Sequence, residues 1–403
     1  MPKPEILFVG NYCRTDYLSM LDKALTYCHF TFLEYISPKE EQNKSYLKYG
    51  EPVYWSQFRD VNMLLQRLKP DKVVFLAIES YNHVILNLAC KRAGIPTYHL
   101  EHGLRADYLI NAELAAKSKQ KKPVLPKISI VSARLRNRLF LERSINCFNA
   151  DDKVFLKTWF KARSQSSFVE LASSIKTLDR IAQNYISFSA GVFKIHKIVD
   201  HLPPDHPVRY IGIPYYDKLA SVTQLAVQRA IIFIDQPLAE HHLLGWTPAY
   251  KVDFAERLKH ITQLLNYKVY IKPHPLQDIT IWQYSKNIEL IDDSRLQDIV
   301  GSIPIVLGFY STYLLPLAAM PHTTLITLEN HPAGRLDVSK SFIDAGVAHP
   351  VYSLDELPVA LENIDQLHQQ QLPHKKKFEE EWLYKFDGKA GERLRDILLS
   401  DEL

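Results

Sequence analysis

A histidine held between two prolines is the first feature of this 403-residue sequence that could do chemistry. His274 lies in the run Lys-Pro-His-Pro at 272–275, directly after an apolar stretch. Because proline restricts its own backbone and that of the residue before it, the imidazole is aimed in a fixed direction. A protonated imidazole can hold a departing phosphate or give it a proton, and Lys272 could add charge. The alternatives are a packed loop histidine and a lysine that points to solvent.

A pair of hydroxyls follows another apolar stretch. Ser311 and Thr312 come after the run at 304–308 and Tyr310, and a second apolar run follows them. This pattern predicts a strand-to-helix junction, where hydroxyls and free backbone N–H groups attract anions. The segment, including Tyr310, is therefore a candidate for nucleotide binding. An ordinary helix N-cap is the competing interpretation.

Two carboxylates end predicted strands in the same half of the chain. Asp235 closes the apolar run at 231–234 and is followed by Gln236, a further candidate for donor binding. Asp235 is either a reactive group or a cap for the next loop. Glu329 closes the run at 323–328 and could accept hydrogen bonds from a ribose or another sugar. Its alternative role is also a cap.

The N-terminal half has its own acid–base candidates. Glu101 and His102 follow the predicted strand at 97–100, and either could accept a proton from an acceptor hydroxyl. A structural role is the alternative. Weaker candidates lie after two other predicted strands: Gly10 with Asn11, which would allow a close backbone approach, and Glu79.

Alternating strand-like and helix-like segments must position these residues. Short apolar runs and amphipathic stretches repeat in both halves, which predicts an α/β protein with two Rossmann-like domains and a cleft between them. This arrangement resembles the glycosyltransferase-B (GT-B) architecture. We expect a first domain over 1–215 with a helical insert at 112–200, a second over 216–375, and helices over 376–403 that pack back across the hinge. A helix is expected over 16–28.

The second domain should bring the candidates together. With the usual strand order 3-2-1-4-5, the order reverses between the first and fourth strands, and ligands bind at such points. The segments that end these strands and their neighbour are 235–237, 272–275 and 309–312. We therefore expect them to meet at one crevice.

Composition excludes several classes. There are 49 Lys plus Arg against 45 Asp plus Glu, a net charge of +4 that does not indicate nucleic-acid binding. Basic residues cluster at 117–127 and again at Arg134, Arg136, Arg138 and Arg143. This cluster indicates either a solvated helix face or attraction to an anionic acceptor or membrane surface.

The sequence carries no known cofactor or metal motif. It has no GxGxxG, no P-loop and no spaced metal-ligand cluster, and Asp292 next to Asp293 indicates a surface turn, so we expect no cofactor and a metal-independent reaction. No 18-residue apolar run and no signal peptide are present. We expect a cytoplasmic protein, with peripheral attachment to the inner face of a bacterial inner membrane as an open alternative. The four cysteines are scattered without a CxxC pair, which fits a reducing compartment.

The motif at 272–275, followed roughly 35 residues later by the Ser-Thr pair, resembles the histidine-proline and serine-serine/threonine motifs of bacterial CMP-sugar transferases. These include sialyltransferases, polysialyltransferases and Kdo (3-deoxy-manno-octulosonic acid) transferases. The resemblance implies that His274, Ser311 and Thr312 hold the CMP phosphate. The acidic D/E-D/E-G motif of sialyltransferases is absent. The layout, including FIDQP at 233–237 and FDGKAG at 386–391, is closer to the retaining β-Kdo transferases of O-antigen and capsule assembly (glycosyltransferase family 99).

That resemblance implies a specific reaction. Kdo would pass from CMP-β-Kdo to a polysaccharide or an undecaprenyl-diphosphate-linked acceptor. Retention implies two inversions, with Asp235 as the nucleophile, and Lys272 or Arg105 would receive the donor carboxylate. The alternatives are a CMP-sialic acid transferase, a CDP-polyol phosphotransferase, and a non-catalytic glycan- or nucleotide-binding module. The chain could also be part of a larger assembly protein.

Overall fold

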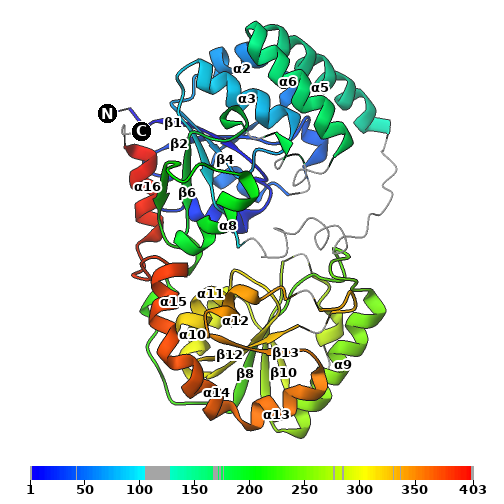
Figure 1. Ribbon diagram of the computed structural model, residues 1–403, viewed down its shortest axis with the longest axis vertical. Coiled ribbons are helices and arrows are strands. Elements are labelled where there is room, and N and C mark those ends of the chain that lie inside the picture. Colours follow the sequence, from blue (N-terminus) through cyan, green and yellow to red (C-terminus); the bar gives the residue numbers. More distant parts are fainter. Residues whose placement is uncertain are drawn as a thin grey trace. The chain divides into compact units, whose positions relative to one another are not determined.

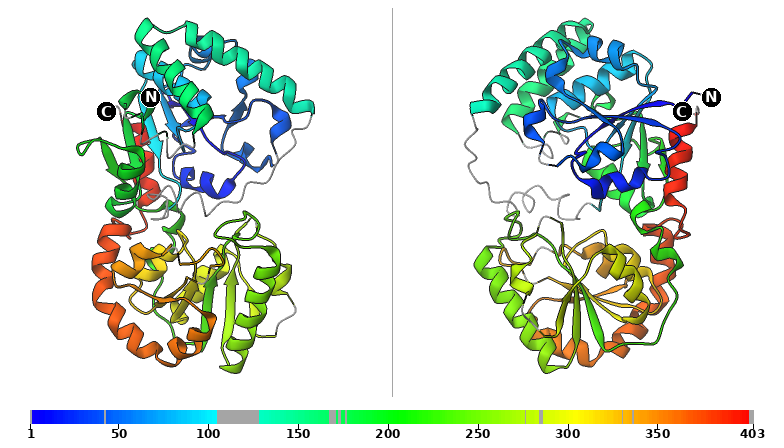
Figure 2. Two further views of the ribbon diagram at one scale, coloured as in Figure 1. Left: turned by 45° about the vertical axis from the view of Figure 1, so that its right-hand side comes forward. Right: turned by 180° about the vertical axis from the view of Figure 1, so that it is seen from behind.

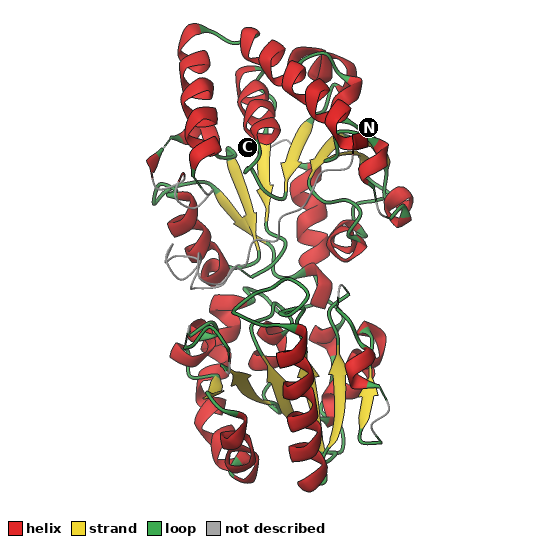
Figure 3. Cartoon of the chain, turned by 90° about the vertical axis from the view of Figure 1, so that its right-hand side faces the viewer, coloured by secondary structure: helices red, strands yellow, loops and turns green. Residues whose placement is uncertain are grey.

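A computed structural model shows two compact α/β units (Figures 1 and 2). The first comprises Met1–His102, Pro123–Tyr215 and Lys389–Leu403, and the second comprises Gly103–Lys122 and Tyr216–Gly388. The structure describes residues 2–41, 43–104, 128–166, 171, 174–175, 177–275, 277–283, 286–329, 331–335 and 337–400. Both units contain parallel sheets flanked by helices, as Figure 3 shows, which confirms the predicted pair of Rossmann-like domains.

The sheet of the first unit has seven parallel strands in the order β3-β2-β1-β4-β5-β6-β7. Its central strands are buried on both faces, which explains their uninterrupted apolar sequences. The strands are β1 (Glu5–Val9), β2 (His29–Leu33), β3 (Glu51–Val53), β4 (Lys72–Phe75), β5 (Thr97–Leu100), β6 (Asn184–Ser187) and β7 (Val208–Tyr210).

Helices cover this sheet. α3 is nearly all buried, and it begins where the Ser80 hydroxyl accepts a hydrogen bond from the His83 N–H. The described helices of this unit are α1 (Thr15–Leu18), α2 (Val61–Leu68), α3 (Tyr81–Arg92), α5 (Ile128–Asn146), α6 (Ala150–Gln165), α8 (Ala190–Asp200) and α16 (Ala390–Leu399).

The C-terminal helix α16 is fixed to the first unit by a buried lysine. The Lys72 ammonium, at the start of β4, donates to the carbonyls of Ile397 at 3.3 Å and Leu398 at 2.7 Å, and also to that of Ser400. A cation at the end of a helix satisfies its last carbonyls and interacts favourably with the helix dipole. The chain therefore returns to its first unit through a specific contact.

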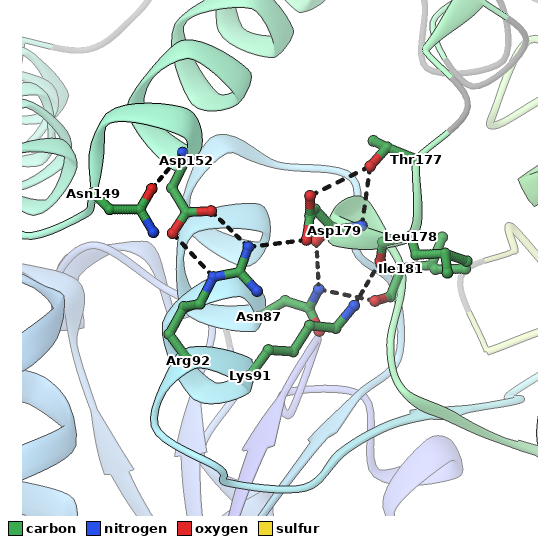
Figure 4. Close-up of polar contacts among 9 residues, drawn as sticks. All are labelled: Asn87, Lys91, Arg92, Asn149, Asp152, Thr177, Leu178, Asp179 and Ile181. Carbon is green, nitrogen blue, oxygen red and sulfur yellow. Dashed lines mark hydrogen bonds and ion pairs between the residues drawn. The ribbon is translucent and has the colours of Figure 1, made fainter.

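A second polar network fixes the insert helix α6 to α3 (Figure 4). The Arg92 guanidinium binds both oxygens of the buried Asp152 carboxylate, at 3.0 and 2.6 Å, and Asn149 caps the helix that carries Asp152. Asn87 and Lys91 donate to backbone carbonyls of the turn at 178–181. Bidentate pairing of this kind is directional, so it orients α6 as well as holding it.

The sheet of the second unit has six parallel strands in the order β10-β9-β8-β11-β12-β13. The predicted strand order 3-2-1-4-5 is thereby confirmed, with β13 as a sixth strand beside β12. The strands are β8 (Ala230–Ile234), β9 (Lys268–Lys272), β10 (Ile288–Leu290), β11 (Ile305–Gly308), β12 (Thr324–Leu328) and β13 (Ala348–Val351). The helices are α9 (Pro248–Leu264), α10 (Asp293–Ile299), α11 (Leu314–Ala319), α12 (Lys340–Asp344), α13 (Leu357–Glu362), α14 (Ile364–Gln371) and α15 (Lys375–Trp382).

Some predicted elements differ from the observed ones. The helix expected over 16–28 is wrong: α1 has four residues and continues only as a 3-10 turn over Ser19–Leu21, and no side chain caps its start. Strands β3 and β13 were not predicted because each contains a proline, which edge strands tolerate. Within the described residues, no helix has the length and apolarity needed to cross a membrane.

Candidate functional site

The carboxyl ends of β8 and β9 lie side by side in the second unit. The Asp235 N–H, just past β8, donates to the Lys272 carbonyl at 3.1 Å. The strand pairing continues in register up to Ile234 and Lys272, so the two polar segments that follow start from the same edge. Parallel pairing thus brings Asp235 and the Lys-Pro-His-Pro segment together, as the strand order predicts.

Asp235 is a buried acceptor, with 5% of its surface exposed. One carboxylate oxygen accepts from Trp282 Nε1 at 2.8 Å and from Gln277 Nε2, and the other accepts from the Gln236 N–H at 2.7 Å. Burial raises the pKa of Asp235 to about 6, although the Lys251 charge and these three donors oppose the rise. Both oxygens are therefore occupied by the protein's own donors.

Gln277 connects this carboxylate to His274. Its side-chain oxygen accepts from the His274 N–H at 3.0 Å, while its side-chain nitrogen binds Asp235. The Gln277 N–H also donates to the His274 carbonyl at 3.0 Å. The backbone of His274 is held on both sides, so its half-buried imidazole starts from a fixed position.

A second carboxylate holds the other end of the same loop. Glu240 accepts from the Asp278 N–H at 2.9 Å and binds the buried Lys251 ammonium, which also donates to the Asp278 carbonyl at 3.3 Å. A buried ion pair is stabilising only when additional hydrogen bonds support it, and here the Asp278 carbonyl gives the lysine a second acceptor. The loop that carries His274 is thus fixed at Gln277 and at Asp278.

Lys272 links this loop to the Ser-Thr segment. Its ammonium lies 3.1 Å from an Asp293 oxygen and 5.0 Å from the centre of the Tyr313 ring, and Tyr313 donates to the same Asp293 carboxylate. Cation–π and ionic contacts together orient the 8%-exposed Lys272. The expected surface turn at Asp292 and Asp293 is instead the start of α10, capped by Asp292.

Ser311 and Thr312 precede α11 and are half-buried. The Ser311 hydroxyl oxygen accepts from the Tyr313 N–H at 3.3 Å, and the Thr312 hydroxyl oxygen accepts from the Leu104 N–H at 2.9 Å. Each hydroxyl still has a proton to donate to an anion. Since α11 has only six residues, these hydroxyls would contribute more than the helix dipole. Tyr310 packs edge-on against Phe342.

Glu329 directly follows β12 and is 3% exposed. Burial raises its pKa, and the neighbouring polar groups of Ser339, Thr327 and the Val338 backbone oppose that rise. Among the described residues, neither carboxylate oxygen of Glu329 has a hydrogen-bond partner. Near it, His331 accepts from Trp246 Nε1 at 3.1 Å, and burial lowers the pKa of His331 to about 4, so this imidazole is neutral. The sugar-binding role of Glu329 stays a prediction.

Glu101 and His102 belong to the first unit, at the carboxyl end of β5. Glu101 is 2% exposed and forms an ion pair with His196, while its other oxygen accepts from the His102 N–H at 3.2 Å. The His102 ring lies edge-on to Tyr17 at 4.9 Å, and its carbonyl accepts from the Tyr215 hydroxyl at 3.4 Å. The Glu101 carboxylate is therefore buried, whereas the His102 imidazole is only half-buried.

Other sequence candidates have local roles. Asn11 accepts from the Tyr35 hydroxyl at 3.1 Å, and the Glu79 carbonyl accepts from Arg163 at 3.4 Å. Arg105 and the basic cluster at 117–127 lie outside the described residues. Across the part of the chain that the structure describes, no group of three or more His, Cys, Asp or Glu side chains could hold a metal ion.

Sequence reasoning missed the residues that hold the candidates in place. Gln277, Trp282 and Lys251 surround Asp235, and His196 pairs with Glu101. Only Gln277 gave a usable signal, because it lies three residues after His274, the spacing of a turn. The others come from distant elements and have ordinary local sequence.

Comparison with known proteins gives a family and a fold. A family model described as alpha-2,8-polysialyltransferase (POLYST) matches residues 5–330. The chain is similar in structure to the wall teichoic acid polymerase TagF (TM-score 0.51, 13% identity, covering 100% of this chain and 89% of that one). It is also similar to the calicheamicin glycosyltransferase CalG4 (0.53, 12%, 99% and 98%) and the spinosyn forosaminyltransferase SpnP (0.53, 11%, 99% and 100%). At such low identity these likenesses show the fold, which is of the GT-B kind. No curated protein matches the sequence.

Proposed function

Because this chain belongs to the alpha-2,8-polysialyltransferase family and is a glycosyltransferase, we propose that its donor is a CMP-activated sugar acid. CMP-sialic acid is the first candidate, since the family supports it. CMP-Kdo is the second, on the resemblance of the segments at 233–237 and 386–391 to Kdo transferases. Both sugars carry a carboxylate on the anomeric carbon, so one type of site can serve either.

The observation that carries this proposal is the fixed backbone of His274, two residues after Lys272, whose ammonium lies over the ring of Tyr313, the residue that follows the Ser-Thr pair. The leaving group of a CMP-sugar is a phosphate monoester, which gains negative charge as the bond to the sugar breaks. A pre-positioned imidazole, an ammonium and two hydroxyls stabilise that charge without having to reorganise. Gln236, Tyr310 and Glu329 are the further donor-binding candidates, with Glu329 for the ribose or sugar hydroxyls.

In the proposed reaction, an acceptor hydroxyl oxygen forms a bond to the anomeric carbon, and the bond from that carbon to the CMP oxygen breaks. His102 takes the hydroxyl proton, and His274 donates a hydrogen bond or a proton to the departing phosphate. Because Asp235 is buried and both of its oxygens accept hydrogen bonds, we assign it to positioning His274 rather than to acting as a covalent nucleophile. A single displacement of this kind inverts the anomeric configuration, whereas an Asp235 adduct would retain it.

We also propose a glycan acceptor, either a polysaccharide or an undecaprenyl-diphosphate-linked chain. The described helix α5 exposes Arg134, Arg136 and Arg138, and basic side chains of this kind are attracted to an anionic membrane surface. Arg138 is also paired with Glu142 at 2.9 Å, which reduces its net contribution.

A donor panel tests the proposal. Purified protein is incubated with CMP-sialic acid, CMP-Kdo, CDP-glycerol and UDP-N-acetylglucosamine together with short glycan acceptors, and nucleotide release is measured. We expect CMP release from one CMP-sugar acid, abolished in His274→Ala and kept in His260→Ala, a matched exposed histidine on α9. Product NMR then gives the sugar and its anomeric configuration.

Two results would overturn the proposal. Turnover of CDP-glycerol or the UDP-sugar instead would assign a different donor. CMP binding without turnover of any donor would indicate a non-catalytic nucleotide-binding module.

A further inference from the structure

We propose that Glu101 and His196 form a buried positioning pair that fixes the backbone of His102, so that Glu101 holds the base and His102 acts as the base. The role of His102 rests on the proposed function. The pairing itself rests on the contacts of the first unit and can be tested without turnover.

The pair is enclosed within the first unit. Glu101 is 2% exposed and His196 is 1% exposed, and a Glu101 oxygen meets His196 Nε2. His196 comes from α8, which starts where the Ser189 hydroxyl accepts from the Val192 N–H. An ion pair removed from water must be held in good geometry, because otherwise desolvation outweighs the attraction.

A second carboxylate faces the other side of the same imidazole. Asp200, one turn further along α8, lies 3.6 Å from His196 Nδ1 and accepts from the Tyr185 hydroxyl at 3.1 Å. The buried Arg180 lies 3.6 Å from the other Asp200 oxygen and donates to the Asp200 carbonyl at 2.7 Å. The cluster thus places the His196 imidazole and the Arg180 guanidinium against two buried carboxylates.

Aromatic packing holds the imidazole in one orientation. The His99 ring stacks on Tyr185 at 4.8 Å and meets His196 edge-on at 4.9 Å. Tyr185 also lies edge-on to His196 at 6.1 Å. A side chain locked by its neighbours can position what it binds to within a fraction of an ångström.

Glu101 and His102 differ in whether they can contact a substrate. One Glu101 oxygen faces His196 and the other accepts from the His102 N–H, so its carboxylate is directed into the protein. His102 is half-buried, with its ring against Tyr17. A misplaced base slows proton transfer far more than it weakens substrate binding, because the effect is confined to the transition state.

Kinetics of four variants test this division of roles. In Glu101→Ala and His196→Ala we expect kcat to fall about 10- to 100-fold with KM for the donor within about twofold. Glu101→Gln keeps a carbonyl oxygen for the His102 N–H, and we expect it to recover most of that loss. The control is Asp152→Asn, which weakens another buried carboxylate pair of the same unit, with Arg92 (Figure 4), and should lower stability while leaving kcat unchanged. If Glu101→Gln were as slow as Glu101→Ala, Glu101 would itself be the base.

A second measurement does not depend on activity. The rate at which diethyl pyrocarbonate modifies His102 is followed by mass spectrometry in the absence of substrate. We expect Glu101→Ala and His196→Ala to change this rate, and Asp152→Asn to leave it at the wild-type value. Unchanged rates in all variants would overturn the positioning pair, whatever the donor proves to be. A changed rate in a protein that turns over no CMP-sugar would keep the pair and contradict the proposed function.

Discussion

The two sheets present a histidine at their carboxyl edges in different ways. In the second unit, the Asp235 carboxylate accepts from the Gln277 side-chain nitrogen, and the Gln277 side-chain oxygen accepts from the His274 N–H. In the first unit, Glu101 accepts from the His102 N–H directly and is itself bound by His196. Asp235 has neutral donors in contact, whereas Glu101 belongs to a cluster of ionisable groups. Each unit thus holds a histidine at its sheet edge through a buried carboxylate, but the neighbours of the two carboxylates are unrelated. We therefore expect substitutions around the two histidines to lower activity to different extents.

The largest expected effect is in His274 itself. His274→Ala removes the group proposed to meet the leaving phosphate, and we expect kcat/KM to fall about 10³-fold. Steady-state CMP release measures this. A loss below about tenfold would remove His274 from the chemistry.

Asp235→Asn should have an intermediate effect. A side-chain amide cannot accept from all the donors around Asp235, so the loop that carries His274 loosens, and we expect a loss of about 10- to 100-fold. A covalent nucleophile would cost about 10⁴-fold or more. Retained configuration in the product, together with the larger loss, would restore the nucleophile assignment.

The same carboxylate predicts a pH dependence. The pKa of Asp235 is raised from 3.8 to about 6, so below about pH 6 the folded protein holds a proton there and loses an acceptor. Activity should therefore fall as the pH drops through 6, and Asp235→Asn should remove that acidic limb. Stability changes in the opposite sense, because protonation favours the folded state, and this contribution declines as the pH rises from about 4 to 6.

Ser311→Ala should have a smaller effect than His274→Ala, and the effect should fall on donor affinity. One hydroxyl hydrogen bond to a charged phosphate contributes about 1.5–3 kcal/mol, which corresponds to roughly a 10- to 150-fold weaker donor affinity. Calorimetric titration with CMP measures it. An unchanged affinity would mean that Ser311 only caps the turn before α11.

The smallest effect on activity is expected at Lys375, a buried residue at the start of α15 that is assigned to neither histidine site. Burial lowers the pKa of Lys375 to about 7, and its ammonium donates to the Ala318 carbonyl at 2.7 Å. Below pH 7 the folded state holds a costly buried charge, and this cost is relieved as the pH rises from about 7 towards 10.5.

Lys375→Met should therefore be more stable than the wild type at pH 6, with an advantage that shrinks by pH 9. Denaturant unfolding at the two values measures the difference. An advantage independent of pH would show that desolvation of the ammonium is not the cause.

The sequence allowed the meeting of the second unit's segments to be predicted, because parallel strand order alone decides which strand ends are neighbours. It did not allow the supporting partners to be predicted. Trp282 reaches Asp235, and His196 reaches Glu101, only through loop and helix positions that local sequence does not encode. The edge strands β3 and β13 were not predicted because each contains a proline. The strand β6 was not predicted because it lies within the segment 112–200, which was expected to be helical. Local patterns thus predicted which polar segments would meet better than they predicted the groups that hold those segments.

The most direct test of the central claim is a crystal structure of this protein with bound CMP. We expect the CMP phosphate at about 3 Å from the His274 imidazole and from a hydroxyl of Ser311 or Thr312. A phosphate bound elsewhere, with these side chains uninvolved, would contradict it.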